Sequence, residues 1–157
     1  MTVVACSPAA EASRAILRET FEGPAGPSTY YIDNDPKGGL FATLDGLSAA
    51  EASRPSGRGG ATIAGHAFHV GFHVEVSAAE LSGDKEPRDW RRSWAVTAVD
   101  EAGWTDLRSR LRRQYEDLVR AIEAAPSESR DALATAIGAV AHAAYHLGAI
   151  RQRIAAA

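Results

Sequence analysis

The chain has 157 residues, which is the length of one ordinary domain and enough to bury a substantial core. Apolar residues make up 45% of it and charged residues 24%, and the formal net charge is -3, so its charge gives no reason to expect a nucleic acid as a partner. Cys6 is the only cysteine, so no intramolecular disulfide can form. No leader segment and no apolar run of about 18 residues stands out, and we therefore expect a cytoplasmic protein that does not enter a membrane.

The first part of the chain predicts helical regions separated by turns. Apolar residues at helical spacing fill residues 8–22, with Ser7 as the N-cap and a proline in the first position. Three prolines and four glycines exclude a long regular element from residues 23–39, but this segment is expected to pack on the body of the protein through Tyr30, Tyr31 and Ile32. Two short helical pieces follow, the second beginning at a capping box of Ser48 and Glu51.

The next helix is predicted to begin at an N-cap, Thr62, and to run to about Leu81. Apolar residues cover so much of its circumference that it must be buried between several partners. One stripe consists of Ile63, Ala67, Val70, Val74 and Leu81, and a neighbouring stripe consists of Phe68, Phe72 and Val76. The neighbouring stripe is more than a four-helix core needs, so we expect it to support a homodimer.

A polar connection, residues 82–103, is expected to be ordered by its two indoles, Trp90 and Trp94. An amphipathic helix covers residues 100–124, and its basic run, residues 108–114, predicts a solvated, ion-paired face rather than a nucleic-acid site.

The last helix is expected over about residues 128–154, after Pro126 and with Ser127 as a candidate cap. No strand pattern competes anywhere in the sequence. The chain is therefore predicted to be a single all-α domain, a helix bundle with extra short helical segments near its N-terminus.

All five histidines fall in two clusters on two apolar helices. His142 and His146 are four residues apart, so their imidazoles project from one face of the last helix, about one turn apart. His66, His69 and His73 lie within one third of the circumference of the other helix, and any of them could turn inward.

A lone buried histidine usually makes ordinary hydrogen bonds. Here the residues around the C-terminal pair are mostly alanines, which offer no side-chain partner to a buried imidazole. Three imidazoles with one or more open positions are the ligand pattern of a reactive divalent metal site, and zinc and nickel are the metals we expect most. The sequence therefore predicts a metal site shared by the two helices.

Two segments, TIAGHAFHV (residues 62–70) and AHAAYHLGAIRQ (residues 141–152), resemble the DinB-like, or DinB/YfiT-like, metalloprotein superfamily. The resemblance covers roughly Leu40 to Ile154. It implies a four-helix bundle of up-down-down-up topology, with one metal-binding histidine in the second core helix and an HxxxHxGQI-type pair in the last. Ala149 replaces the frequent glutamine of that motif, which does not affect ligation.

The family pattern places a histidine seven residues after a capping Ser or Thr and before a Leu, Ile or Val. From Thr62 this pattern falls on His69, so the resemblance implies the metal ligands His69, His142 and His146. His66 and His73 would then be second-shell residues or alternative ligands. Arg151, which follows the histidine pair, is a candidate for binding an anionic group.

The resemblance implies a metal-dependent enzyme that acts on a small molecule. Relatives are similar to transferases or isomerases that use a low-molecular-weight thiol such as mycothiol or bacillithiol, and others to hydrolases. The alternative is a non-enzymatic metal-binding module that serves a stress response or binds a small ligand. No general acid or base stands beside the histidines in the sequence, because nothing fixes the direction of Glu75 or Glu80.

Overall fold

The computed structural model describes residues 7–55, 59–126 and 129–156, and within these ranges every regular element is helical. Four helices are long and two are short, and a 3-10 helix, η1 (Trp90–Trp94), precedes α5. The helices are α1 (Pro8–Glu22), α2 (Leu40–Asp45), α3 (Ala49–Ala52), α4 (Ile63–Leu81), α5 (Glu101–Ala124) and α6 (Arg130–Ala155). The predicted all-α class is confirmed.

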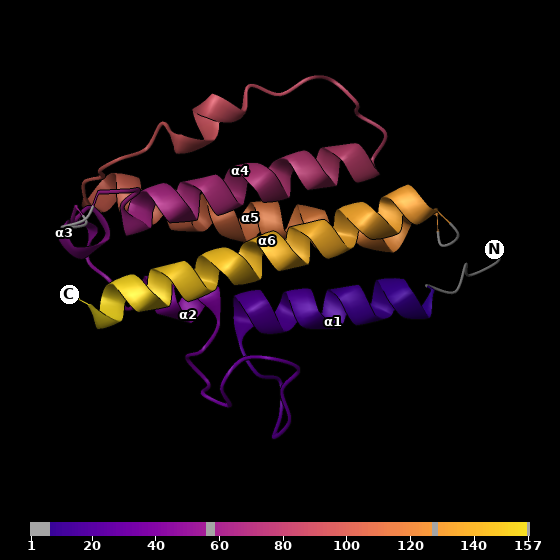
Figure 1. Ribbon diagram of the computed structural model, residues 1–157, viewed down its shortest axis with the longest axis horizontal. Coiled ribbons are helices and arrows are strands. Elements are labelled where there is room, and N and C mark those ends of the chain that lie inside the picture. Colours follow the sequence, from indigo (N-terminus) through magenta and orange to yellow (C-terminus); the bar gives the residue numbers. More distant parts are fainter. Residues whose placement is uncertain (1–6, 56–58, 127–128, 157) are drawn as a thin grey trace.

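The four long helices form an up-down-down-up bundle. Figure 1 shows α1 and α6 running in one direction and α4 and α5 in the other. The parallel pair α4 and α5 is possible because the connection between them runs back along the whole of α4, carrying η1 with it. The two short helices, α2 and α3, lie between α1 and α4 in the chain, and they are the extra helical segments that the sequence predicts.

Helix starts follow the predicted caps. The hydroxyl of Ser7 accepts from the Ala10 N–H, and Ser48 and Glu51 form the expected capping box. The last helix begins at Arg130 rather than two residues earlier, because Ser129 is its cap. Ser127, the predicted cap, lies outside the described residues.

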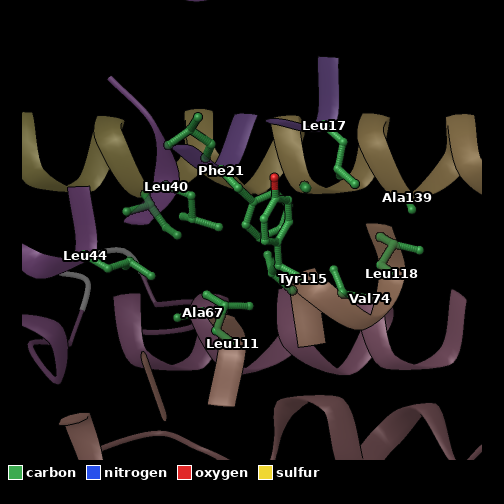
Figure 2. Close-up of a cluster of buried hydrophobic side chains, with 14 of the residues drawn as sticks. Leu17, Phe21, Leu40, Leu44, Ala67, Val74, Leu111, Tyr115, Leu118 and Ala139 are labelled. Atoms are coloured by element: carbon green, nitrogen blue, oxygen red, sulfur yellow. The ribbon is translucent and has the colours of Figure 1, made fainter. Parts of the chain in front are cut away.

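The core lies between all four long helices (Figure 2). Phe21 of α1 stacks on Tyr115 of α5, with ring centroids 4.8 Å apart. Leu17 and Leu118 are fully buried, and burial of a leucine side chain contributes about 1.5–3 kcal/mol. The face of α6 that joins this core includes Ala139, so the bundle is closed around one hydrophobic centre.

The segment between α1 and α2 is held on α1 by the carboxylate of Glu19. This carboxylate accepts hydrogen bonds from three successive backbone N–H groups, those of Tyr30, Tyr31 and Ile32. Burial alone would raise the pKa of Glu19, but the three N–H groups bring it below its usual value. The segment packs on the body as predicted through Ile32 and the Tyr31 hydroxyl, which donates to Thr20, whereas the Tyr30 side chain is 69% exposed.

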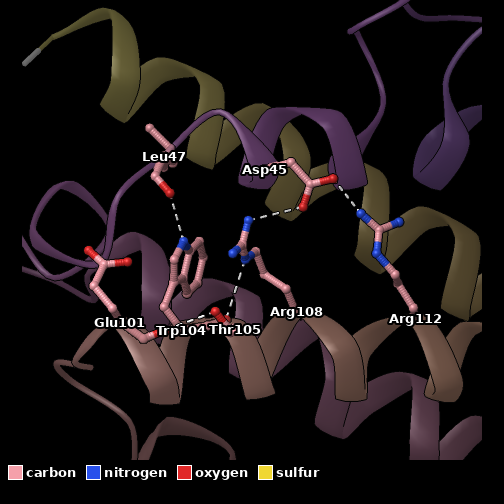
Figure 3. A network of polar contacts seen from close by, with 7 residues as sticks. All are labelled: Asp45, Leu47, Glu101, Trp104, Thr105, Arg108 and Arg112. Carbon is pink, nitrogen blue, oxygen red and sulfur yellow. Dashed lines mark hydrogen bonds and ion pairs between the residues drawn. The ribbon is translucent and has the colours of Figure 1, made fainter.

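The start of α5 is fixed to the short helices by polar contacts (Figure 3). The indole N–H of the fully buried Trp104 donates to the Leu47 carbonyl at 2.8 Å. Asp45 pairs with Arg108 and Arg112. The basic run of α5 thus forms ion pairs on the surface, as the sequence predicts.

By length and composition, α6 could cross a membrane, because an 18-residue window within it has a mean hydropathy of 1.3. The core helix of a folded protein meets the same test, so the expectation that the protein does not enter a membrane stays a prediction. The bundle accounts for the apolar composition, since α6 buries Ala143, Leu147 and Ile150 against its neighbours.

The connection after α4 touches the first turn of α4 at Gly65. A Cβ atom at Gly65 would lie 2.9 Å from the Val96 carbonyl oxygen, closer than real contacts allow. The Thr62 hydroxyl donates to the Thr97 carbonyl next to it, at 2.9 Å. The backbone of the connection therefore docks directly on the helix that carries three of the histidines.

Replacement Gly65→Ala is expected to lower the free energy of unfolding by about 1–3 kcal/mol, because the added methyl must displace backbone atoms. Gly138→Ala is the matched control, since a Cβ there meets nothing within 4 Å and alanine favours a helix interior by about 0.5–1 kcal/mol. Urea denaturation measures both. Equal stability of the two variants would contradict the close approach at Gly65.

Candidate metal centre

The antiparallel packing of α4 and α6 brings all five histidines into one cluster. The centroids of contacting histidine rings are 3.8–5.1 Å apart. The shortest of these distances joins His73 and His142, and the longest joins His66 and His146. The two clusters that the sequence places on separate helices therefore meet.

Three of the five could hold one metal ion. One ring nitrogen from each of His69, His142 and His146 lies within 4.8 Å of the other two. His69 and His146 are buried, with 9% and 4% of their surface exposed, and His142 is half-buried. Two nitrogens bound to one tetrahedral zinc ion are about 3.3 Å apart. The 3.0 Å between the Nε2 atoms of His69 and His142 is close to that spacing.

The hydrogen bonds around His69 determine which of its nitrogens carries the proton. Its Nδ1 lies 2.8 Å from the hydroxyl of Ser93, and that hydroxyl donates its own proton to the Trp90 carbonyl at 2.7 Å. Ser93 can therefore only accept from His69, so the proton of the neutral ring is on Nδ1. The lone pair on Nε2 is left facing His142.

His142 has no arrangement of its neutral ring that satisfies both nitrogens. Its Nδ1 is buried without a hydrogen-bond partner among the described residues. If the proton of His142 is on Nε2, it can be donated to Nε2 of His69, but Nδ1 of His142 is then a buried acceptor without a partner. If the proton is on Nδ1, the Nε2 lone pairs of His142 and His69 face each other at 3.0 Å. A cation between the two Nε2 atoms would remove that repulsion, so the donor set fits a metal ion.

His66 and His73 each contact one member of the triplet. Nδ1 of His66 is 2.9 Å from Nδ1 of His146, so one of these rings donates to the other. A His146 that donates from Nδ1 keeps its lone pair on Nε2. His73 stacks on His142 with an interplanar angle of 13° and lies 3.4 Å from the Ser77 hydroxyl. Both positions are those of residues that orient ligands.

The cluster is neutral at physiological pH. Burial lowers the pKa of all five histidines, and neighbouring imidazoles lower most of them further. The pKa of His142 falls to about 3 and that of His146 to about 4. Metal ions bind the neutral form of imidazole, so no proton competes for these nitrogens near pH 7.

The connection that crosses α4 covers the cluster. Trp94 of η1 stacks on His69 with ring centroids 3.9 Å apart and an interplanar angle of 12°, and Trp90 contacts His73. The sequence predicts that these indoles order the connection, and in the structure they lie on the histidines. Nothing in the sequence pointed to Ser93, although it lies between the two tryptophans.

Arg151 and Glu75, two other candidate residues, are paired with groups outside the triplet. Arg151 pairs with Asp33 at 3.1 Å, on the segment that follows α1. Arg153 is the arginine whose charge reaches the cluster, where it helps to lower the pKa of His66. The carboxylate of Glu75 binds Arg110 and Gln114 of α5. Tyr145 is 72% exposed and contacts the ring of His146, with centroids 5.0 Å apart.

Comparison with known proteins identifies one family. The model of the DinB superfamily matches residues 39–150, which is more than two thirds of the chain and includes all five histidines. No curated protein and no solved structure matches the chain. The long helix α1 lies before the matched region, yet it packs against α6 as a full member of the bundle.

The pKa values predict how the metal-free protein responds to acid. Because the histidines have a pKa near 6.5 when unfolded and a lower one when folded, the unfolded chain takes up protons first as the pH falls below 6.5. The free energy of unfolding is therefore expected to be highest above pH 6.5 and to decrease towards pH 4. Urea denaturation in the presence of a chelator measures this.

The interval from pH 6.5 to pH 5 isolates the histidines, because unfolded carboxylates titrate near pH 4. Constant stability across that interval would show that the histidines are not buried in the folded protein.

Proposed function

Because this chain belongs to the DinB superfamily, we propose that it binds a divalent metal ion through His69, His142 and His146. The observation that carries the proposal is the convergence of three neutral imidazoles from α4 and α6, one of them with its proton held away from the others by Ser93. His66 and His73 touch this triplet and are the alternative ligands. Zinc and nickel suit a site made of imidazoles.

We further propose that the protein is an enzyme acting on a small molecule. A divalent ion held by three histidines keeps positions open, and it lowers the pKa of a bound water or thiol. The residues of the chain orient this site and exclude water from it, through the stacked Trp94 and the buried His146. Nδ1 of His66 would accept the hydrogen bond from Nδ1 of His146, which leaves the lone pair on Nε2 of His146 for the metal.

A low-molecular-weight thiol is the nucleophile that this site favours. The nearest acidic residue on α4, Glu75, is bound to Arg110 and Gln114, so its carboxylate is already paired. A thiol needs less help from a general base than water does, because its own pKa is lower. We therefore favour a thiol-dependent transferase or isomerase and place a hydrolase second.

The second candidate is a non-enzymatic module that uses the metal for structure or for binding a small ligand. The pairing of Glu75 with α5 also favours a non-enzymatic module, because it leaves the cluster without a carboxylate that could act as a general base. Among the described residues, no carboxylate contacts the histidines through a hydrogen bond or ion pair. Removal of the metal by a chelator tests for a structural role, because a structural metal is required for folding, whereas a metal that binds a substrate or a small ligand is not.

Localisation and partners are part of the proposal. We infer a cytoplasmic protein that binds neither nucleic acid nor membrane. The homodimer expected from Phe68, Phe72 and Val76 stays a prediction, for which sedimentation is the measurement. In the structure these three side chains are among those that line a groove of about 570 Å³ between α4, α5 and the connection that follows α4.

The metal site is tested by elemental analysis of the purified protein. His142→Ala and His146→Ala are expected to lose most of the bound divalent metal, because two imidazoles hold an ion far less tightly than three. Ile137→Ala is the matched control, since this side chain of the same helix is 53% exposed and its loss is expected to leave the metal content unchanged. In the wild type, metal at about 100 times its Kd should raise the free energy of unfolding by about 2.7 kcal/mol. Unchanged metal content in His146→Ala would disprove the site.

The enzyme proposal is tested by the consumption of a low-molecular-weight thiol with a panel of electrophiles. Metal-loaded wild type is expected to accelerate the loss of thiol, and chelated wild type and His146→Ala are expected to show only the background rate. Thiol loss is followed by a colorimetric assay and the product by mass spectrometry. A metal-loaded protein that neither binds nor consumes a thiol would exclude this activity and favour the non-enzymatic module.

A further inference from the structure

We propose that Ser93 is a positioning residue for the metal, acting through His69. It holds the proton of this imidazole on Nδ1 and so keeps the Nε2 lone pair available as a ligand. The inference rests on the proposed metal site and adds to it a residue from outside α4 and α6, the two helices that carry the histidines.

The geometry around Ser93 is that of a built contact. Its side chain belongs to η1 and is 0% exposed. The hydroxyl is 2.8 Å from Nδ1 of His69 and 2.7 Å from the carbonyl oxygen of Trp90, within its own turn of η1. A hydroxyl has one proton, and the carbonyl can only accept it, so the direction of both hydrogen bonds is fixed.

Without this hydroxyl, nothing among the described residues would hold the His69 proton on Nδ1. The ring could then place it on Nε2 and donate to the Nε2 of His142, 3.0 Å away. That tautomer cannot bind a metal through Nε2. The observed affinity falls in proportion to the fraction of the protein in the competent state, so loss of Ser93 weakens binding without removing a ligand.

The stacked indole of Trp94 does not replace the serine. It restrains the plane of the His69 ring, with an interplanar angle of 12°, but a stacked ring does not discriminate between the two nitrogens. The division of roles is therefore clear: Trp94 sets the orientation of the ring and Ser93 sets its tautomer.

The contact also couples the metal to the connection between α4 and α5. Ser93 binds His69 only in the tautomer that the metal requires, so the docked connection favours metal binding, and bound metal must favour the docked connection by the same free energy. The connection carries exposed basic residues just before the contact, including Arg91, whose side chain is 95% exposed. Trypsin can therefore report whether this segment is docked.

The test is a comparison of Ser93→Ala with Ser77→Ala. Ser77 is also a buried hydroxyl near a histidine, but it is 3.4 Å from His73, which lies outside the ligand triplet. Zinc affinity is measured by competition with a chromophoric chelator. Ser93→Ala is expected to bind zinc about 10–100-fold more weakly with unchanged stoichiometry, and Ser77→Ala as tightly as the wild type. Equal affinity of Ser93→Ala and the wild type, or equal weakening in both variants, would overturn the proposal.

A second measurement does not depend on the variant. Long-range ¹H–¹⁵N NMR of the metal-free wild type distinguishes the tautomers of each histidine, and His69 is expected to carry its proton on Nδ1. A proton on Nε2 would overturn the proposal even if Ser93→Ala failed to fold. Zinc is also expected to slow tryptic cleavage after Arg91 in the wild type and to protect Ser93→Ala less.

Failure of this inference is distinguishable from failure of the metal site itself. If the wild type binds no zinc and His146→Ala behaves in the same way, the metal site is wrong. If the wild type binds zinc, His146→Ala does not, and Ser93→Ala binds as the wild type does, the site stands and the role of Ser93 is wrong.

Discussion

The packing of five imidazoles between α4 and α6, two of them buried and three partly buried, is the constraint on which the rest of this structure depends. Each neutral ring carries one donor and one acceptor, and a buried polar atom without a partner is destabilising. The surrounding positions on α6 are small and apolar, such as Ala143 and Ala139, which are fully buried and offer nothing polar. The rings must therefore satisfy one another, reach a polar group from elsewhere in the chain, or share a cation. For His142 the first two means are not sufficient, because its Nδ1 has no partner among the described residues, and a cation could be shared only through its Nε2, which faces Nε2 of His69.

The topology supplies the polar group from elsewhere. Because α4 and α5 run in the same direction, the chain must return along α4, a distance of about 28 Å for its 19 residues. A shorter connection would force an antiparallel neighbour and leave the histidines without a cover. The return path brings η1 over the middle of α4, where Ser93 meets His69 and Trp94 stacks on it. The connection that allows the parallel pair thus also completes the site.

Much of the fold and half of the site could be predicted from the sequence because they are local. The caps at Ser7 and Thr62 and the spacing of His142 and His146 depend on residues within one or two turns. The choice of His69 among three histidines rested on a family pattern, and the helical wheel alone left it open. Ser93 could not be predicted, since its role follows from the path of a connection without periodicity. The ion pair of Arg151 could not be predicted for the same reason, because its partner Asp33 is 118 residues away in the chain.

The distribution of charge around the cluster bears on what the site can do. Glu75 of α4 is paired with Arg110 of α5, and Asp33 is paired with Arg151 of α6. Arg153 acts on His66 as a positive charge. A cluster that carries no formal charge of its own and lies beside an arginine leaves any bound divalent ion with its full positive charge. Such a site stabilises an anion on the metal more than a carboxylate-rich site would, because no ligand charge offsets the ion. This electrostatic setting suits a thiolate or a hydroxide better than a neutral ligand, and it gives a physical reason for an all-imidazole donor set in a protein that would act on electrophiles.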